Sequence, residues 1–162
     1  MPSFNVLTFG EARRPKERFP GGNFKTQRDF LDIIVDNVSL FEEMKRRRLD
    51  LVSPFWFGTD IAQEVSANGI ESAERLLLQR PADFQGDRRS FFVCPECADL
   101  GCGAVSAVVE SGGDAFVWRD FGYENNWEGK VTKDDFTNVG PFVFDFVEYG
   151  KAFRDLISRL GR

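Results

Sequence analysis

The sequence predicts an α+β fold in which an antiparallel β-meander packs against two or three helices. Two observations lead to this prediction. From Arg89 onward, short segments rich in β-branched and aromatic residues alternate with turn residues, as in successive strands. Elsewhere, capping residues and amphipathic spacing indicate helices. A chain of 162 residues is the size of one domain, so we expect a single domain over residues 1–162.

The first third of the chain predicts two strands and a helix. Residues 4–9 (FNVLTF) are typical of a short strand, and residues 28–36 (RDFLDIIVD) of a second one. Between them, residues 11–28 are rich in charge, proline and glycine, which predicts a mobile loop. Ser39 and Glu42 have the spacing of a capping box, which predicts that a helix begins here.

The middle of the chain predicts an aromatic loop and a second helix. In residues 49–58 (LDLVSPFWFG), Pro54 interrupts strand pairing, so we expect the aromatic rings that follow it to fill the core from a loop. Asn68 and Glu71 repeat the capping spacing, and Pro81 stops the helix that they begin.

The last half of the chain predicts four strands and a final helix. Three strands are expected at 90–96, 103–110 and 114–124, with a hairpin turn over residues 111–114. A fourth is expected at 141–149 (PFVFDFVEY), where alternate phenylalanines share one face. Residues 150–162 (GKAFRDLISRLGR) predict an amphipathic helix whose inward residues are Phe153, Leu156, Ile157 and Leu160.

Composition narrows the classes of function. The net charge of −5 and pI near 4.9 argue against a nucleic-acid binder and suit a basic protein partner. The sequence contains no segment of the ~18 apolar residues that a membrane span needs and no signal peptide, so we expect a cytoplasmic protein. The absence of histidine removes most hydrolase and metalloenzyme motifs and favours a non-enzymatic role.

All three cysteines, Cys94, Cys97 and Cys102, lie in the stretch FFVCPECADLGCGAV. If residues 98–101 form a turn, Cys97 and Cys102 become neighbours. The CPEC segment matches half of a zinc knuckle, and Glu96, Asp99 or a remote carboxylate would have to supply the missing ligand.

Two other interpretations of the cysteines stay open. A redox role is disfavoured because the adjacent carboxylates oppose thiolate formation. In the third interpretation, which the sequence favours over the other two, the thiols are small apolar groups that pack a tight hairpin, with Gly101 and Gly103 supplying the turn. No cofactor is expected unless the cysteines bind zinc.

The segments CPECADLGCGAVSAVVE and FVWRDFGYENN together resemble a little-characterised group of bacterial proteins of actinobacterial type. That group carries C-x2-C-x-DLGCGAV and WRDFGYEN motifs, and its members are sometimes loosely labelled oxidoreductases. The resemblance covers residues 91–127. The resemblance supplies no mechanism, and the oxidoreductase label is not carried over to this chain, because the sequence lacks the GxGxxG fingerprint of a dinucleotide site after a strand.

The segment WRDFGYENNW is also a candidate binding surface, because arginine, tyrosine and tryptophan carry most interface energy. Strand alternation would place Trp118, Asp120 and Gly122 on one face and Arg119, Phe121 and Tyr123 on the other. The residues proposed to contact a partner are Trp118, Arg119, Asp120, Tyr123, Glu124 and Trp127.

Two alternatives for this segment stay open. In one, Arg119 only pairs with Glu124 or Asp120 at a sheet edge. In the other, Asp120, Tyr123 and Glu124 form a carboxylate enzyme site.

The function favoured by these observations is a protein-binding domain, such as an immunity protein or antitoxin that covers a basic partner. The alternative is a zinc-binding or redox protein centred on Cys94, Cys97 and Cys102.

Overall fold

Residues 3–58 and 63–161, which the computed structural model describes, form three α-helices and nine strands in three antiparallel sheets. The α+β prediction is therefore confirmed. None of the described helices is both long enough and apolar enough to span a membrane.

A four-stranded meander forms the larger sheet. It contains β6 (Arg88–Phe92), β7 (Ala104–Gly112), β8 (Ala115–Glu124) and β9 (Phe142–Asp145), each antiparallel to its neighbour in chain order. Its longest hairpin joins β7 to β8 through the turn predicted at 111–114. The segment 141–149 is only partly a strand, because Asp145 ends β9 and caps the following helix.

A β-bulge in β8 overturns the alternation predicted for WRDFGYENNW. Ser106 pairs with Gly122, whereas Val108 pairs with Arg119, so two residues of β8 oppose one residue of β7. Asp120, in the bulge, has a left-handed φ of 58°. As a result Trp118 and Phe121 are both buried, while Arg119 and Asp120 between them are both exposed.

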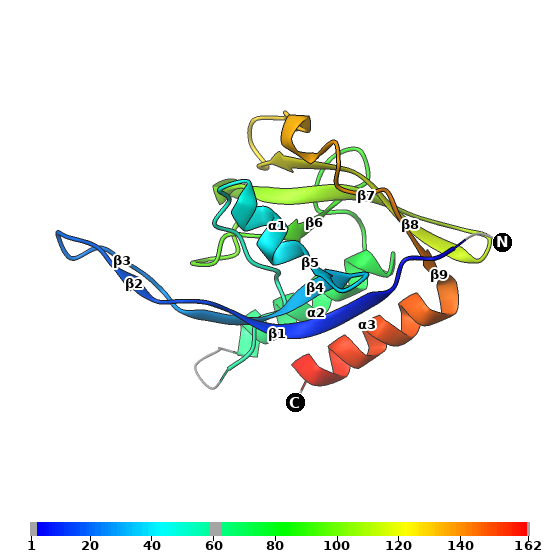
Figure 1. Cartoon of the computed structure of the whole chain (residues 1–162), viewed down its shortest axis with the longest axis horizontal. Coiled ribbons are helices and arrows are strands. Elements are labelled where there is room, and N and C mark those ends of the chain that lie inside the picture. Colours follow the sequence, from blue (N-terminus) through cyan, green and yellow to red (C-terminus); the bar gives the residue numbers. More distant parts are fainter. Residues whose placement is uncertain (1–2, 59–62, 162) are drawn as a thin grey trace.

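The second sheet is built on a long hairpin. Its strands are β1 (Leu7–Arg14), β4 (Arg28–Val35) and β5 (Val38–Ser39). Beyond the last β1–β4 pair, β2 (Glu17–Arg18) and β3 (Phe24–Lys25) continue as a narrow ribbon that projects from one end of the molecule (Figure 1). We call residues 15–27 the arm. The loop predicted over 11–28 is thus largely a hairpin, and its mobility stays a prediction.

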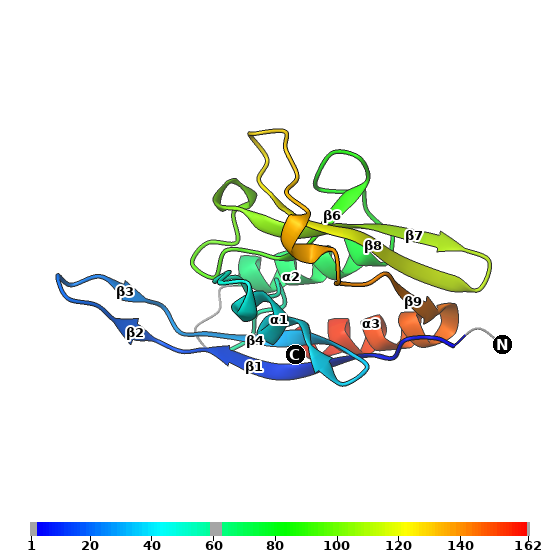
Figure 2. The ribbon, with the colours of Figure 1, turned by 45° about the horizontal axis from the view of Figure 1, so that its top comes forward.

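Three helices complete the fold: α1 (Leu40–Arg46), α2 (Gln63–Leu76) and α3 (Phe146–Leu160). The predicted cap of α1 is confirmed, since Ser39 Oγ accepts a hydrogen bond from Glu42 N at 3.1 Å. The predicted start of the second helix is wrong: α2 begins before Asn68, which therefore lies inside it. Helix α3 contacts both β1 and β8, so it links the two larger sheets (Figure 2).

The core is rich in aromatic side chains. Trp118 of β8 is fully buried and donates from Nε1 to Tyr149 Oη at 3.0 Å. Tyr149, on α3, donates in turn to the carbonyl of Leu76 at the end of α2, at 2.5 Å. Phe55 and Trp56 are also buried, as predicted for the rings after Pro54. The hydrogen bonds that link Trp118, Tyr149 and Leu76 join the meander to α3 and α2.

Candidate metal centre

The loop between β6 and β7, residues 93–103, brings the three cysteines together. Their Sγ atoms lie within 4.8 Å of one another, and Cys97 Sγ is 3.5 Å from Cys102 Sγ. The predicted proximity of Cys97 and Cys102 is confirmed. All three are free thiols; Cys97 and Cys102 are exposed, and Cys94 is half-buried.

Local hydrogen bonds give this loop, which we call the cysteine loop, its shape. Val93 is held by a two-bond bridge to Val52, with N–O distances of 2.7 and 3.0 Å. Ala98 N donates to Cys94 O at 2.8 Å and closes the first turn. Asp99 Oδ1 then accepts from Gly101 N at 2.7 Å and begins a short 3-10 turn, which returns Cys102 toward Cys97.

The electrostatics of the thiols favour a bound cation. The hydrogen bond with Cys97, together with the charges of Cys94 and Cys97, raises the pKa of Cys102 to about 11. Cys102 is therefore protonated at neutral pH in the absence of metal and is a weak nucleophile, which argues against a redox role for it. A metal cation would compensate three adjacent thiolates and displace their protons.

The spacing fits a tetrahedral metal. Zinc binds thiolate sulfur at ~2.3 Å, which separates two sulfur ligands by about 3.8 Å in a tetrahedral site. Within the described residues, the three cysteines gather without a carboxylate. Glu96, expected as a fourth ligand, instead pairs with Arg14 at 2.5 Å, and Asp99 is engaged by the backbone of Gly101. The described side chains thus leave the fourth position open.

The WRDFGYENNW segment packs on the cysteine loop, so the two motifs of the resemblance meet in space. Tyr123 pairs with Val105, and a Cβ atom on Gly103 would lie 2.0 Å from Tyr123 Oη. Trp127 Nε1 donates to Gly101 O at 3.1 Å. Tyr123 and Trp127 therefore cover the loop from the side of β8.

The six residues proposed to contact a partner do not form one surface. Trp118 is fully buried, and Glu124 is buried in an ion pair with Arg88 at 2.9 Å, so neither can meet a partner. This corrects the expectation for both. Glu124 is also too engaged with Arg88 to serve the predicted carboxylate site with Asp120, whose side chain pairs with Arg119.

Among the remaining four residues, Arg119, Asp120 and Trp127 are exposed and Tyr123 is half-buried. Arg119 also donates from Nε to Glu110 at 2.8 Å, in addition to its pairing with Asp120. The pairing of Arg119 with Asp120 agrees with the alternative in which Arg119 only forms an ion pair at the sheet edge. Trp127 lies beside the cysteine loop, where it contacts Gly101.

Two arginines that sequence reasoning missed hold the cysteine loop in place. Arg28 donates from Nε to Pro95 O at 2.9 Å, and its guanidinium lies 3.9 Å from the ring centroid of Trp56. Arg14 pairs with Glu96, whose Oε2 also accepts from Thr26 N at 3.2 Å. No local motif could reveal these contacts, because the partners lie 67 to 82 positions apart.

Comparisons with protein-family models, curated proteins and solved structures found no match to the chain. The geometry of the cysteines is therefore the main evidence for function.

A polar pocket of about 260 Å³ opens beside the cysteines. Cys97, Ala98 and Leu100 form one wall, and α2 contributes Glu71 and Arg75 to another. A small polar molecule in this pocket would lie next to Cys97.

Proposed function

We propose that the chain is a zinc-binding protein in which Cys94, Cys97 and Cys102 hold one Zn²⁺ ion and a ligand from outside the described residues fills the fourth position. The observation that carries this proposal is the gathering of three Sγ atoms within 4.8 Å. Thiolate is the ligand type that zinc prefers in such loops.

Burial argues against the simplest alternative, in which the thiols pack as small apolar groups. Such thiols would be among the most buried side chains of the domain. Cys97 and Cys102 are exposed instead, although the neighbouring strands β6 and β7 are largely buried. The cluster therefore contributes little to the hydrophobic core. Metal ligation, unlike core packing, accounts for three thiols that lie close together at the surface.

A Zn²⁺ ion bound by three thiolates has a net charge of −1, and the residues around the cysteines suit such a charge. Burial lowers the pKa of the Arg28 guanidinium, and the charges of Glu96 and, to a smaller extent, Cys94 oppose this shift, so Arg28 is a cation close to the cysteine loop. Asp99 N donates to Cys97 Sγ at 3.4 Å and so orients this sulfur. Contacts of this kind orient metal ligands and raise metal affinity.

The described side chains supply three ligands, and we infer that the fourth is an exchangeable molecule, unlike in a closed structural site. Structural zinc sites have four protein ligands, whereas sites that bind an exchangeable molecule have three. The pocket beside Cys97 could admit such a molecule. We expect the metal to fasten the cysteine loop and to keep one coordination position available. A role on a basic protein partner stays a prediction from the overall charge.

The direct test is metal content of protein purified without chelator, followed by replacement of zinc with Co²⁺ and absorption spectroscopy. We expect one zinc per chain and the intense sulfur-to-cobalt bands of thiolate ligation. Cys94→Ser, Cys97→Ser and Cys102→Ser should each reduce these bands. Asp99→Asn is the matched control, because asparagine can still accept from Gly101 N and the proposal gives Asp99 no ligand role. Metal-free protein whose thiols react equally fast with and without added zinc would refute the proposal.

A further inference from the structure

Among the described residues, five of the seven exposed large apolar side chains lie at the two ends of the molecule, and the other two are Val38 and Trp127. Phe19 and Phe24 lie on the arm at one end. Val6, Phe146 and Val147 lie at the other end, around the beginning of α3 (Figure 1). Phe24 and Val6 each expose about three-fifths of their surface, at 60% and 61%. Apolar groups concentrated in this way mark interaction surfaces.

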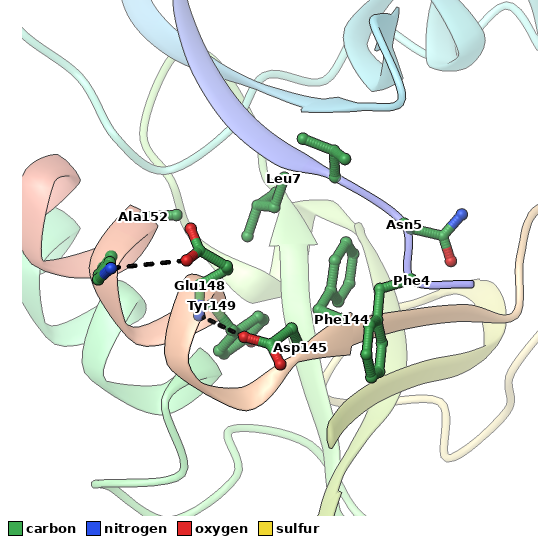
Figure 3. A pocket seen from close by; sticks show the side chains of 10 residues that line it. Phe4, Asn5, Leu7, Phe144, Asp145, Glu148, Tyr149 and Ala152 are labelled. Carbon is green, nitrogen blue, oxygen red and sulfur yellow. Dashed lines mark hydrogen bonds and ion pairs between the residues drawn. The ribbon is translucent and has the colours of Figure 1, made fainter. Parts of the chain in front are cut away.

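The end opposite the arm contains a pocket of about 610 Å³. Its walls come from residues 4–7, the end of β9 and the first turns of α3 (Figure 3). The rings of Phe4, Phe144 and Tyr149 line the pocket, and Asp145 and Glu148 place carboxylates along one side. Lys151 also lines it and pairs with Glu148 at 3.5 Å. Two carboxylates against one cation leave an excess of negative charge, so the pocket suits an aromatic group accompanied by positive charge.

The arm offers such a group. Arg18 pairs with Phe24 across the ribbon, and Lys16 lies two positions before Arg18, so all three share one face. Lys16 Nζ lies 5.7 Å from the ring centroid of Phe24. This face thus presents an aromatic ring flanked by two cations.

The arm and the rest of the chain carry opposite net charge. The arm contains Lys16, Arg18 and Lys25 but only one carboxylate, Glu17, so its net charge is +2. Because the whole chain has a net charge of −5, the remaining residues carry −7. An acidic body opposes the approach of a nucleic acid and attracts the basic arm of another copy.

We propose that the arm of one copy inserts Phe24 into the apolar pocket of a second copy and places Lys16 and Arg18 beside Asp145 and Glu148. The arm lies at one end of the long axis, and the start of α3, which helps to line the pocket, lies at the other (Figure 1). Two copies side by side in opposite directions would therefore make the contact twice. The result is a closed two-fold dimer, the commonest symmetric assembly. This proposal does not depend on a bound metal.

Sedimentation velocity over a range of protein concentrations tests the proposal. The wild-type chain should form a dimer that weakens as salt increases. Phe24→Ala should raise the dimer dissociation constant by about tenfold or more, because a central aromatic anchor is lost. The residue is exposed, so the monomer should keep its fold, which circular dichroism would check.

Charge reversal tests the pairing itself. Arg18→Glu and Glu148→Arg should each weaken the dimer, and the double variant should recover most of the affinity. Lys133→Glu, which makes the same charge change as Arg18→Glu at another exposed position, is the control and should leave the dimer unchanged. A wild-type chain that stays monomeric, or a double variant no tighter than either single variant, would overturn the proposal. A full-length chain that stays monomeric and binds an anionic oligonucleotide through its arm would also overturn the proposal, and it would show that the partner of the arm is a nucleic acid.

Discussion

Arg14 of β1 and Glu96 of the cysteine loop, 82 positions apart, form an ion pair in which Nη1 lies 2.5 Å from Oε2. Arg14 is almost fully buried and also pairs with Asp50 at 2.7 Å. Burial acts to raise the pKa of Glu96, but the hydrogen bonds from Arg14 and Thr26 outweigh it and lower that pKa below its usual value. One carboxylate thus joins the cysteine loop to the base of the arm.

Removing this carboxylate should loosen both segments. We expect Glu96→Ala to lower the free energy of unfolding by about 1–2 kcal/mol, since Arg14 keeps Asp50 but loses one partner. The amide of Thr26 should exchange faster with solvent because its acceptor is gone. Urea unfolding and hydrogen exchange measure these effects. Glu17→Ala, which removes an exposed carboxylate of the arm that has no contact with Arg14, is the control. Unchanged exchange at Thr26 would show that Glu96 does not hold the arm base.

A side chain at position 103 should damage the candidate metal centre. Gly103 has a φ of +100°, and an added Cβ atom would lie 2.0 Å from Tyr123 Oη. We expect Gly103→Ala to cost at least about 3 kcal/mol in unfolding free energy and to weaken zinc binding. The double variant Gly103→Ala/Tyr123→Ala removes the clash but not the backbone strain, so it should recover only part of the loss of zinc affinity. Full recovery would mean that the strain is negligible.

The buried pair of Arg88 and Glu124 should matter for stability. Arg88 Nε lies 2.9 Å from Glu124 Oε2 and also contacts Ser106 Oγ at 3.1 Å. Glu124→Gln leaves a buried guanidinium without its counter-charge, so we expect a loss of about 3–5 kcal/mol in chemical unfolding. Glu110→Gln, at the exposed pair with Arg119, should cost less than about 1 kcal/mol. Equal effects of the two changes would contradict the burial of Glu124.

Asp32 should make stability depend on pH. Burial, opposed by hydrogen bonds from Ser39 and Phe41, raises its pKa from 3.8 to about 6. The folded chain therefore binds a proton at this site between about pH 4 and 6 that the unfolded chain has released, so this group favours folding as pH falls. Relative to Asp32→Asn, the wild-type chain should gain on the order of 3 kcal/mol between pH 7 and pH 4. Urea unfolding of both chains at each pH checks this; a constant difference between them would rule out the shift.

Short-range patterns in the sequence were reliable where the physical cause is local. The cap at Ser39 depends on a contact three residues away, and it forms as predicted. Cys97 and Cys102 also meet as predicted, because a five-residue separation spans only one turn. Asn68 had the same capping spacing as Ser39 but failed, since α2 begins earlier and leaves no helix end there to cap.

Alternation along β8 failed because one extra residue shifts every following side chain to the other face of the sheet. The bulge opposite Ala107 lies in the pairing with β7, and strand pairing is invisible in a single strand's sequence. Burial of Trp118 next to exposed Arg119 agrees with simple alternation, whereas exposure of Asp120 and burial of Phe121 do not.

The sequence by itself determined the α+β class, the order of the meander strands and the clustering of the thiols, because periodicity, turns and caps act over a few residues. Only the tertiary structure decided that Glu96 holds Arg14 rather than completing a metal site and that Glu124 is buried against Arg88. It also decided that a basic arm and an acid-lined apolar pocket lie at opposite ends. These outcomes depend on sheet register and on contacts between residues distant in the chain, whose free energies no local pattern records.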